Sequence, residues 1–201
     1  MSKEIKIAIA GLGTIGGGVY KILVNQINQI NKRCKTPLKL IAVSNLNKPD
    51  FYQDSDAKFY NNCLDLVNDK EIDIIIELIG GSDGISYKLA KSSLEAKKHY
   101  ITANKALIAK HGNELSNIAE NNNVYLNFEA AVAGGIPVIK NLREGLAANK
   151  IEKLVAILNG TCNFILTKME KENIPFDQVL KEAQELGYAE ADPTFDIEGI
   201  D

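Results

Sequence analysis

The sequence predicts an α/β fold, a doubly wound parallel sheet followed by part of an α+β domain. Short apolar runs typical of strands alternate with stretches of helical periodicity as far as residue 128, which indicates parallel strands joined by helical crossovers. The first apolar run passes through a glycine-rich turn straight into a helical stretch. Beyond residue 128 the chain becomes rich in small residues and glycine and then mainly helical, which places a domain boundary at 128/129.

The glycine-rich turn follows the first predicted strand, residues 4–10, and precedes a helix expected to run to about residue 30. It reads Gly11-Leu12-Gly13-Thr14-Ile15-Gly16. In such a turn Gly11 permits the tight bend, Gly13 lets the backbone approach a pyrophosphate, and Gly16 lets helix and strand pack closely. The strand–turn–helix context predicts a Rossmann-type dinucleotide site with phosphates at the helix N-terminus; a turn without a ligand is the alternative.

The second predicted strand, 39–43, bears on the choice of dinucleotide. In folds that prefer NAD, an acidic residue at the end of this strand holds the ribose 2′-hydroxyl. Here the strand is followed by Ser44-Asn45-Leu46-Asn47-Lys48, which contains no acid. Polar and basic groups suit a 2′-phosphate and favour NADP, whereas a plain polar loop explains the same residues equally well.

The remaining elements of the first domain, 1–128, continue the alternation. Strands are predicted at 73–79, 99–102 and 124–128, and helices at 61–68, 87–98 and 113–122. The strand at 73–79 is mostly apolar, as a central parallel strand should be, and it ends in Gly80-Gly81 at the edge where ligands bind. We expect His99 to begin a strand and His111 to lie in a loop, both in structural roles.

The second domain, 129–201, is expected to be only partly present. A helix is predicted at 137–146, a strand at 151–158, and two helices at 161–172 and 176–186. Gly187 then stands where the C-cap of the last helix is expected.

Composition excludes several classes of protein. Apolar residues make up 45% of the 201 residues and charged residues 24%, as in an ordinary globular protein. The net charge of −3, without a basic block, argues against nucleic acid, and no apolar run is long enough for a membrane span. No secretory signal opens the chain, so we expect a cytoplasmic location. Three scattered cysteines suggest neither disulfides nor a zinc site.

Two stretches near the boundary carry residues suited to chemistry. Lys105 follows a predicted strand on the ligand edge, where a lysine can hold an anion or help a proton move, although a surface lysine is the simpler interpretation. The loop 129–137 combines Glu129 with small residues, and its oxygens suit a hard cation. A hinge between domains explains the loop equally well.

Two further stretches lie in the second domain. The turn 159–163 places Thr161 at the start of a helix, as an N-cap or a ligand contact, with the N-cap favoured. The run 187–201 sets acids among Tyr, Phe and Pro, a composition suited to presenting carboxylates to a cation such as a substrate ammonium. A solvated acidic loop is the alternative.

The chain resembles homoserine dehydrogenase along nearly its whole length. The resembling pieces are GLGTIGGGV at 11–19, ELIGG at 77–81, TANKALIA at 102–109, FEAAVAGGIPVIKNLRE at 128–144, ILNGTCNFILT at 157–167 and EAQELGYAEADPTFDIEGID at 182–201. The resemblance implies reduction of aspartate 4-semialdehyde to homoserine with NADPH or NADH, in threonine and methionine biosynthesis. It also implies a small-molecule substrate, no nucleic acid or membrane partner, and a homodimer.

The resemblance also implies roles for individual residues. Cofactor contacts would come from Gly11, Gly13, Thr14, Ile15, Gly16, Gly80 and Gly187, with Lys105 between cofactor and substrate. Glu190 and Asp201 match the carboxylates that hold the substrate. A monovalent cation, sodium or potassium, would bind Glu129 and the backbone carbonyls of Val132, Gly134 and Ile136.

One departure from the family limits the expected activity. The family carries a general-acid lysine one helical turn after the last aspartate, in the pattern D-x-x-x-K, whereas this sequence stops at Asp201. We therefore expect the front part of a homoserine dehydrogenase with little or no turnover. The alternatives are a non-catalytic NADP-binding module or fragment, and a semialdehyde dehydrogenase with Cys162 as its nucleophile.

Overall fold

The computed structural model describes residues 4–53, 57–189 and 193–199. The chain forms two compact units, Met1–Ala147 and Ala148–Asp201, which we describe separately. The predicted domain boundary at 128/129 remains a prediction. Glu190 and Asp201, the expected substrate carboxylates, lie outside the described residues.

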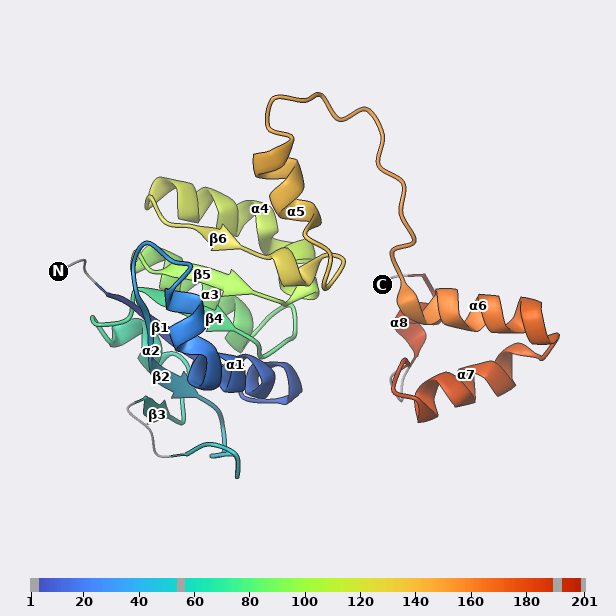
Figure 1. Ribbon diagram of the computed structural model, residues 1–201, viewed down its shortest axis with the longest axis horizontal. Coiled ribbons are helices and arrows are strands. Elements are labelled where there is room, and N and C mark those ends of the chain that lie inside the picture. The colour runs from blue at the N-terminus through green and yellow to red at the C-terminus, as the bar shows by residue number, and fades with distance from the viewer. Residues whose placement is uncertain (1–3, 54–56, 190–192, 200–201) are drawn as a thin grey trace. The chain divides into compact units, whose positions relative to one another are not determined.

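Within the described residues, the first unit is built on a six-stranded sheet in the order β3-β2-β1-β4-β5-β6 (Figure 1). All five strand pairs are parallel. The strands are β1 Ile5–Ala10, β2 Leu38–Ser44, β3 Lys58–Tyr60, β4 Ile74–Glu77, β5 His99–Thr102 and β6 Leu126–Asn127. The order reverses between β1 and β4, and the carboxyl ends of strands at such a reversal form the ligand crevice of open α/β sheets.

Helices cover both faces of this sheet. They are α1 Thr14–Asn31, α2 Asp65–Asn68, α3 Ile85–Glu95 and α4 Lys105–Asn121, followed by η1 Glu129–Ala131, α5 Val138–Lys140 and the π-helix η2 Asn141–Gly145. Alternation along β1 separates two cores, because Ile7 and Ile9 face a cluster with Tyr20 of α1. Ala8 and Ala10 face the other cluster, which includes Leu89 of α3 and Leu107 of α4. The predicted doubly wound α/β fold is confirmed.

The second unit contains three described helices, α6 Gly160–Glu172, α7 Phe176–Glu185 and α8 Thr194–Ile197. Its small core joins α6 and α7 through Ile165, Val179 and Ala183, with Ala189 from the following turn. α6 and α7 match the two helices expected from the sequence.

The strand expected at 151–158 is wrong. Residues 151–159 have no regular secondary structure, and their apolar side chains face solvent, with Val155 and Ile157 each 79% exposed. A strand needs a partner to satisfy its backbone groups, and no strand of the described chain pairs with this segment. Apolar alternation alone was therefore not sufficient evidence for a strand at 151–158.

Two other expectations also need correction. His111 was expected in a loop, but α4 begins already at Lys105 and contains His111. The helix starts early because Asn104 caps it, its side chain accepting from the Leu107 N–H. The short edge strand β3 and helix α8 were not predicted from the sequence.

Within the described residues, no helix has the length and apolar character needed to cross a membrane.

Helix α1 packs onto the end of β1 through Gly16. A Cβ added at this glycine would lie 1.9 Å from the carbonyl oxygen of Gly11, closer than any real contact. Gly18, in the same helix, has no atom within 4 Å of an added Cβ. Gly16 is therefore required by close packing, whereas at Gly18 only the helix propensity of the residue matters.

We predict opposite effects on stability for alanine at these two positions. Gly16→Ala should lower the free energy of unfolding by about 1–3 kcal/mol, because α1 must move away from β1. Gly18→Ala should raise it by about 0.5–1 kcal/mol, since alanine loses less backbone entropy in a helix. Urea unfolding followed by circular dichroism measures both, and equal effects would contradict the packing.

Candidate functional site

The glycine turn leads from the carboxyl end of β1 into a helix whose N-cap makes no side-chain hydrogen bond. Gly11 has φ +96°, and a Cβ on it would lie 2.7 Å from the carbonyl oxygen of Leu78. Gly13 is the N-cap of α1, and no side chain of the described residues caps this helix end. Apart from its chain neighbours, no atom in the described part of the chain would lie within 4 Å of a Cβ on Gly13. An uncapped helix N-terminus beside open space is suited to binding an anion such as a diphosphate.

A cavity of about 320 Å³ lies beside this turn. It is lined by the glycine turn and by the residues that follow β2 and β4, among them Gly13, Asn45, Leu78 and Ile79. Its volume and mixed lining are those of a small-molecule pocket. The cavity therefore coincides with the switch point of the sheet, where the sequence predicted a dinucleotide.

The end of β2 carries an amide where NAD-preferring folds have an acid. The Oδ1 atom of Asn45 accepts a hydrogen bond of 3.1 Å from the Leu12 N–H, and its Nδ2 donates to the carbonyl of Asn47. Asn45 thus ties the glycine turn to the loop after β2. It places no negative charge beside the cavity.

The loop between β4 and α3, residues 78–84, forms another wall of the site. It starts from Glu77, whose side chain is fully buried at 0% exposure. Its Oε1 accepts from the N–H groups of Ile79 (2.8 Å) and Gly80 (3.1 Å), and its Oε2 accepts from the Thr102 hydroxyl (2.6 Å). Sequence reasoning missed Glu77 because it treated this residue only as a charge within an apolar strand. A lone acid directly before a glycine pair was the available signal.

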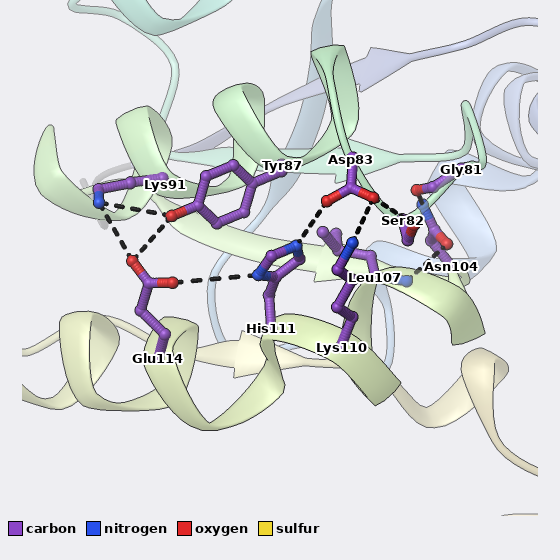
Figure 2. Close-up of polar contacts among 10 residues, drawn as sticks. All are labelled: Gly81, Ser82, Asp83, Tyr87, Lys91, Asn104, Leu107, Lys110, His111 and Glu114. Carbon is purple, nitrogen blue, oxygen red and sulfur yellow. Dashed lines mark hydrogen bonds and ion pairs between the residues drawn. The ribbon is translucent and has the colours of Figure 1, made fainter.

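The other side of this loop is held from α4 and α3. Asn104 donates from Nδ2 to the carbonyl of Gly81 (2.6 Å), as Figure 2 shows. Ser86 donates from its hydroxyl to the carbonyl of Gly80 (2.6 Å). Lys105, the first residue of α4, is exposed and follows the capping Asn104 directly. The structure thereby brings Gly80 and Lys105 to one edge of the sheet, as expected.

An ionic network continues along the facing sides of α3 and α4 (Figure 2). Asp83 accepts from Lys110 Nζ at 2.7 Å, and its Oδ1 lies 3.0 Å from Nε2 of His111. The His111 ring packs on Tyr87 with 4.3 Å between centroids. Hydrogen bonds from Lys110 and then His111 hold the pKa of the Asp83 carboxyl well below its usual range. His111 therefore links α4 to Asp83 and to Tyr87 of α3, and the structural role expected from the sequence stays a prediction.

The expected cation-binding residues lie in one loop. Glu129 accepts from the N–H groups of Ile139 (3.0 Å) and Lys140 (2.8 Å), and Ile136 accepts at its carbonyl from Val138 (2.8 Å). Carboxylate and carbonyl oxygens keep further lone pairs in such bonds, so the oxygen donor set remains compatible with a hard cation. The described residues contain no cluster of three or more His, Cys, Asp or Glu side chains placed to hold a metal.

In the second unit, the N-cap of α6 is Asn159 and not Thr161. The Asn159 side chain accepts from the Cys162 N–H at 2.7 Å, while the Thr161 hydroxyl donates to the carbonyl of Tyr188 at 2.6 Å. Both residue types make good caps, so residue type alone does not distinguish the two positions. Gly187 has φ +76° just after the C-cap of α7, as predicted.

These residues enclose a cavity within the second unit. It has a volume of about 470 Å³, and its lining includes Asn159, Thr161, Gly187 and Tyr188. The structure thus places Gly187, an expected cofactor contact, beside Thr161, for which a ligand contact was the less favoured alternative to an N-cap. The Cys162 thiol donates to the carbonyl of Asp196 at 3.3 Å, and both histidines of the chain belong to the other unit.

Comparison with known proteins assigns both units to one family. Residues 11–129 match the family described as homoserine dehydrogenase, NAD binding domain, and residues 137–201 match the family described as homoserine dehydrogenase. A homoserine dehydrogenase of Neisseria gonorrhoeae is 48% identical over 99% of this chain and 46% of its own length. One from Pseudomonas aeruginosa is 47% identical with the same coverage. The chain spans about half the length of the curated relatives it matches.

Solved structures of homoserine dehydrogenases are also similar to this chain. A homoserine dehydrogenase from Thiobacillus denitrificans superposes with a TM-score of 0.89 at 47% identity, covering 99% of this chain and 46% of that one. A hyperthermophilic archaeal homoserine dehydrogenase in complex with NADPH superposes with a TM-score of 0.83 at 28% identity, covering 98% of this chain and 66% of that one.

The network around Asp83 predicts a pH-dependent contribution to stability. Folding lowers the pKa of Asp83 below the ordinary value of 3.8, so the stabilisation is present above that pH and is lost as the pH falls through the folded-state value. Asp83→Asn should therefore lower the urea midpoint slightly near neutral pH, and the difference from the unaltered chain should shrink in acid. Asp50→Asn, at an exposed turn, is the control. A difference that grows as the pH falls would contradict the assignment.

Proposed function

The chain belongs to the homoserine dehydrogenase family, and from this premise we propose that it binds NADP(H) on the glycine turn. In the proposed reaction, L-aspartate 4-semialdehyde and L-homoserine are interconverted, a step in threonine and methionine biosynthesis. The observation that carries the proposal is the uncapped N-terminus of α1, which adjoins open space at Gly13 and the cavity at the switch point.

The proposed preference is for NADP over NAD. Asn45 occupies the position where an acid would bind the ribose 2′-hydroxyl, and an amide does not repel a 2′-phosphate. Lys48 follows in the same loop and adds a positive charge. The archaeal relative in complex with NADPH supports the same choice.

Different residues of the first unit are proposed to contact different parts of the cofactor and the substrate. Diphosphate contacts are proposed for the backbone of the turn, at Gly11, Gly13, Thr14, Ile15 and Gly16. The nicotinamide, when bound, supplies or accepts the hydride, and Gly80 is proposed to lie beside it. The exposed ammonium of Lys105 is proposed to hold the substrate oxygen at the same strand edge.

Substrate and cation contacts are proposed for the later part of the chain. Glu190 and Asp201 would hold the substrate ammonium through charge-assisted hydrogen bonds, and Gly187 would contact the cofactor. Sodium or potassium would bind Glu129 and the carbonyls of Val132, Gly134 and Ile136, an all-oxygen set suited to a hard cation. We also propose a domain boundary at 128/129 and a homodimer for the complete protein.

Gly13→Ala separates cofactor binding from folding. Gly13 has φ −68°, and its Cβ would meet open space, so the substitution should lower the unfolding midpoint only by the modest cost of alanine at an N-cap. The added methyl group would occupy the path of the diphosphate and weaken NADPH binding by about tenfold or more. Titration followed by nicotinamide fluorescence measures it, with Gly18→Ala as the matched control. Unchanged affinity in Gly13→Ala would contradict the proposed site.

We predict little or no turnover for the 201-residue chain itself. The resemblance places the family's proton-donor lysine one helical turn beyond Asp201, outside a polypeptide made of these 201 residues alone. The purified chain should bind NADPH yet show no measurable oxidation of homoserine with NADP. A rate like that of a full-length relative assayed in parallel would contradict this prediction. NADPH binding without turnover, even after the chain is extended through the D-x-x-x-K motif, would favour a non-catalytic nucleotide-binding module.

A further inference from the structure

We propose that Glu77 is a positioning residue that holds the nicotinamide-side loop and Lys105 in one fixed arrangement. The inference rests on the proposed function, because it concerns how the same site receives the nicotinamide end of the cofactor. Glu77 itself is buried beneath the loop and does not face the cavity.

The first step is the burial of the carboxylate. Glu77 is the last residue of β4, is 0% exposed, and accepts hydrogen bonds on both oxygens. Burying such a group is costly unless donors surround it, and an apolar residue would serve the core of a central strand better. A carboxylate at this position is therefore explained by what it holds. The carboxylate accepts hydrogen bonds from two consecutive backbone N–H groups at the point where the chain leaves the sheet.

The second step is that these bonds close a ring. Thr102 donates to Glu77 and accepts from the Asn104 N–H at 2.9 Å. Asn104 donates to the carbonyl of Gly81, and Gly81 follows Gly80, whose N–H returns to Glu77. The ring joins the end of β4, the loop after it, the end of β5 and the N-cap of α4. A change at any one member removes one side-chain link between these segments, while β4 and β5 remain paired in the sheet.

The third step is that the loop needs such restraint. Gly80 and Gly81 have φ +90° and +83°, and a Cβ added at either would have no atom of the described residues within 4 Å, its chain neighbours aside. Glycines in this conformation give the backbone room to approach a ligand, and they also make it loose in the absence of other contacts. Ser86 holds the Gly80 carbonyl, and Asn104 holds the Gly81 carbonyl. Glu77 supplies the matching restraint on the N–H side.

The fourth step reaches the candidate catalytic lysine. Asn104 caps α4 by accepting from the Leu107 N–H at 3.0 Å, and Lys105 is the next residue. The ring therefore fixes the start of α4 in relation to Gly80. Small misplacements of reacting groups are costly in catalysis, so a rigid link between these two points serves hydride transfer directly.

The test compares two ligands that differ only at the nicotinamide. NADPH carries both ends of the cofactor, whereas 2′-phospho-ADP-ribose has the same adenosine and diphosphate and lacks the nicotinamide. The variants are Glu77→Gln, which places an amide N–H against Thr102, and Thr102→Val, which removes the hydroxyl at nearly constant volume. Thr102→Ser keeps the hydroxyl and should rescue. Ser93→Ala removes another buried hydroxyl, bonded to the Leu89 carbonyl within α3, and reports general destabilisation.

We expect Glu77→Gln and Thr102→Val to weaken NADPH binding by about tenfold and to leave 2′-phospho-ADP-ribose binding within about twofold. Thr102→Ser and Ser93→Ala should bind both ligands like the unaltered chain. Equal weakening of both ligands, or unchanged NADPH affinity, would overturn the positioning role. If Glu77→Gln does not fold, Thr102→Val and Thr102→Ser test the positioning role by the same comparison of the two ligands. Failure of the unaltered chain to bind either ligand would instead overturn the proposed function, and this inference with it.

Discussion

The contact of Gly16 with the Gly11 carbonyl is the constraint on which the site depends. No side chain fits between the end of β1 and the first turn of α1, so the helix starts directly at the strand end. This proximity aims the free N–H groups of the helix at the space beyond β1. The same space is walled by the residues after β2 and β4 because the strand order reverses there. The close packing at Gly16, the reversal of strand order and the partial positive charge of the helix N-terminus therefore all occur at the end of β1.

A second glycine turn lies beside the first. The Leu78 N–H donates to the carbonyl of Ala10 at 2.8 Å, and a Cβ on Gly11 would collide with the Leu78 carbonyl. The two turns differ in how they are held. Backbone packing and one hydrogen bond from the Leu12 N–H to the Asn45 side chain shape the turn after β1, whereas buried side chains, above all Glu77, hold the turn after β4. This division suits a cofactor whose diphosphate needs backbone donors and whose ring needs an exact position.

What the sequence predicted well follows from local constraints. Glycine spacing and apolar alternation predicted β1, α1 and the glycine turn between them, because these depend on neighbours in the chain. Glu77 was missed because its partner Thr102 is distant in sequence, and α4 was begun too late because its cap, Asn104, was not recognised. The segment 151–158 has the apolar pattern of a strand, but no strand of the described chain pairs with it. The apolar pattern alone therefore led to a wrong prediction of a strand. Glu190 and Asp201, the proposed substrate carboxylates, lie outside the described residues, and their proposed role rests on the family resemblance.

The most direct test of the central claim is an NMR titration of the ¹⁵N-labelled chain with NADPH. If the diphosphate binds the opening turn and the nicotinamide the second, the amide signals of Gly13, Thr14 and Ile15 should shift, together with those of Gly80 and Gly81. With 2′-phospho-ADP-ribose, only the first group should shift to the same extent. Saturable NADPH binding that leaves the signals of the first turn unmoved would contradict the account.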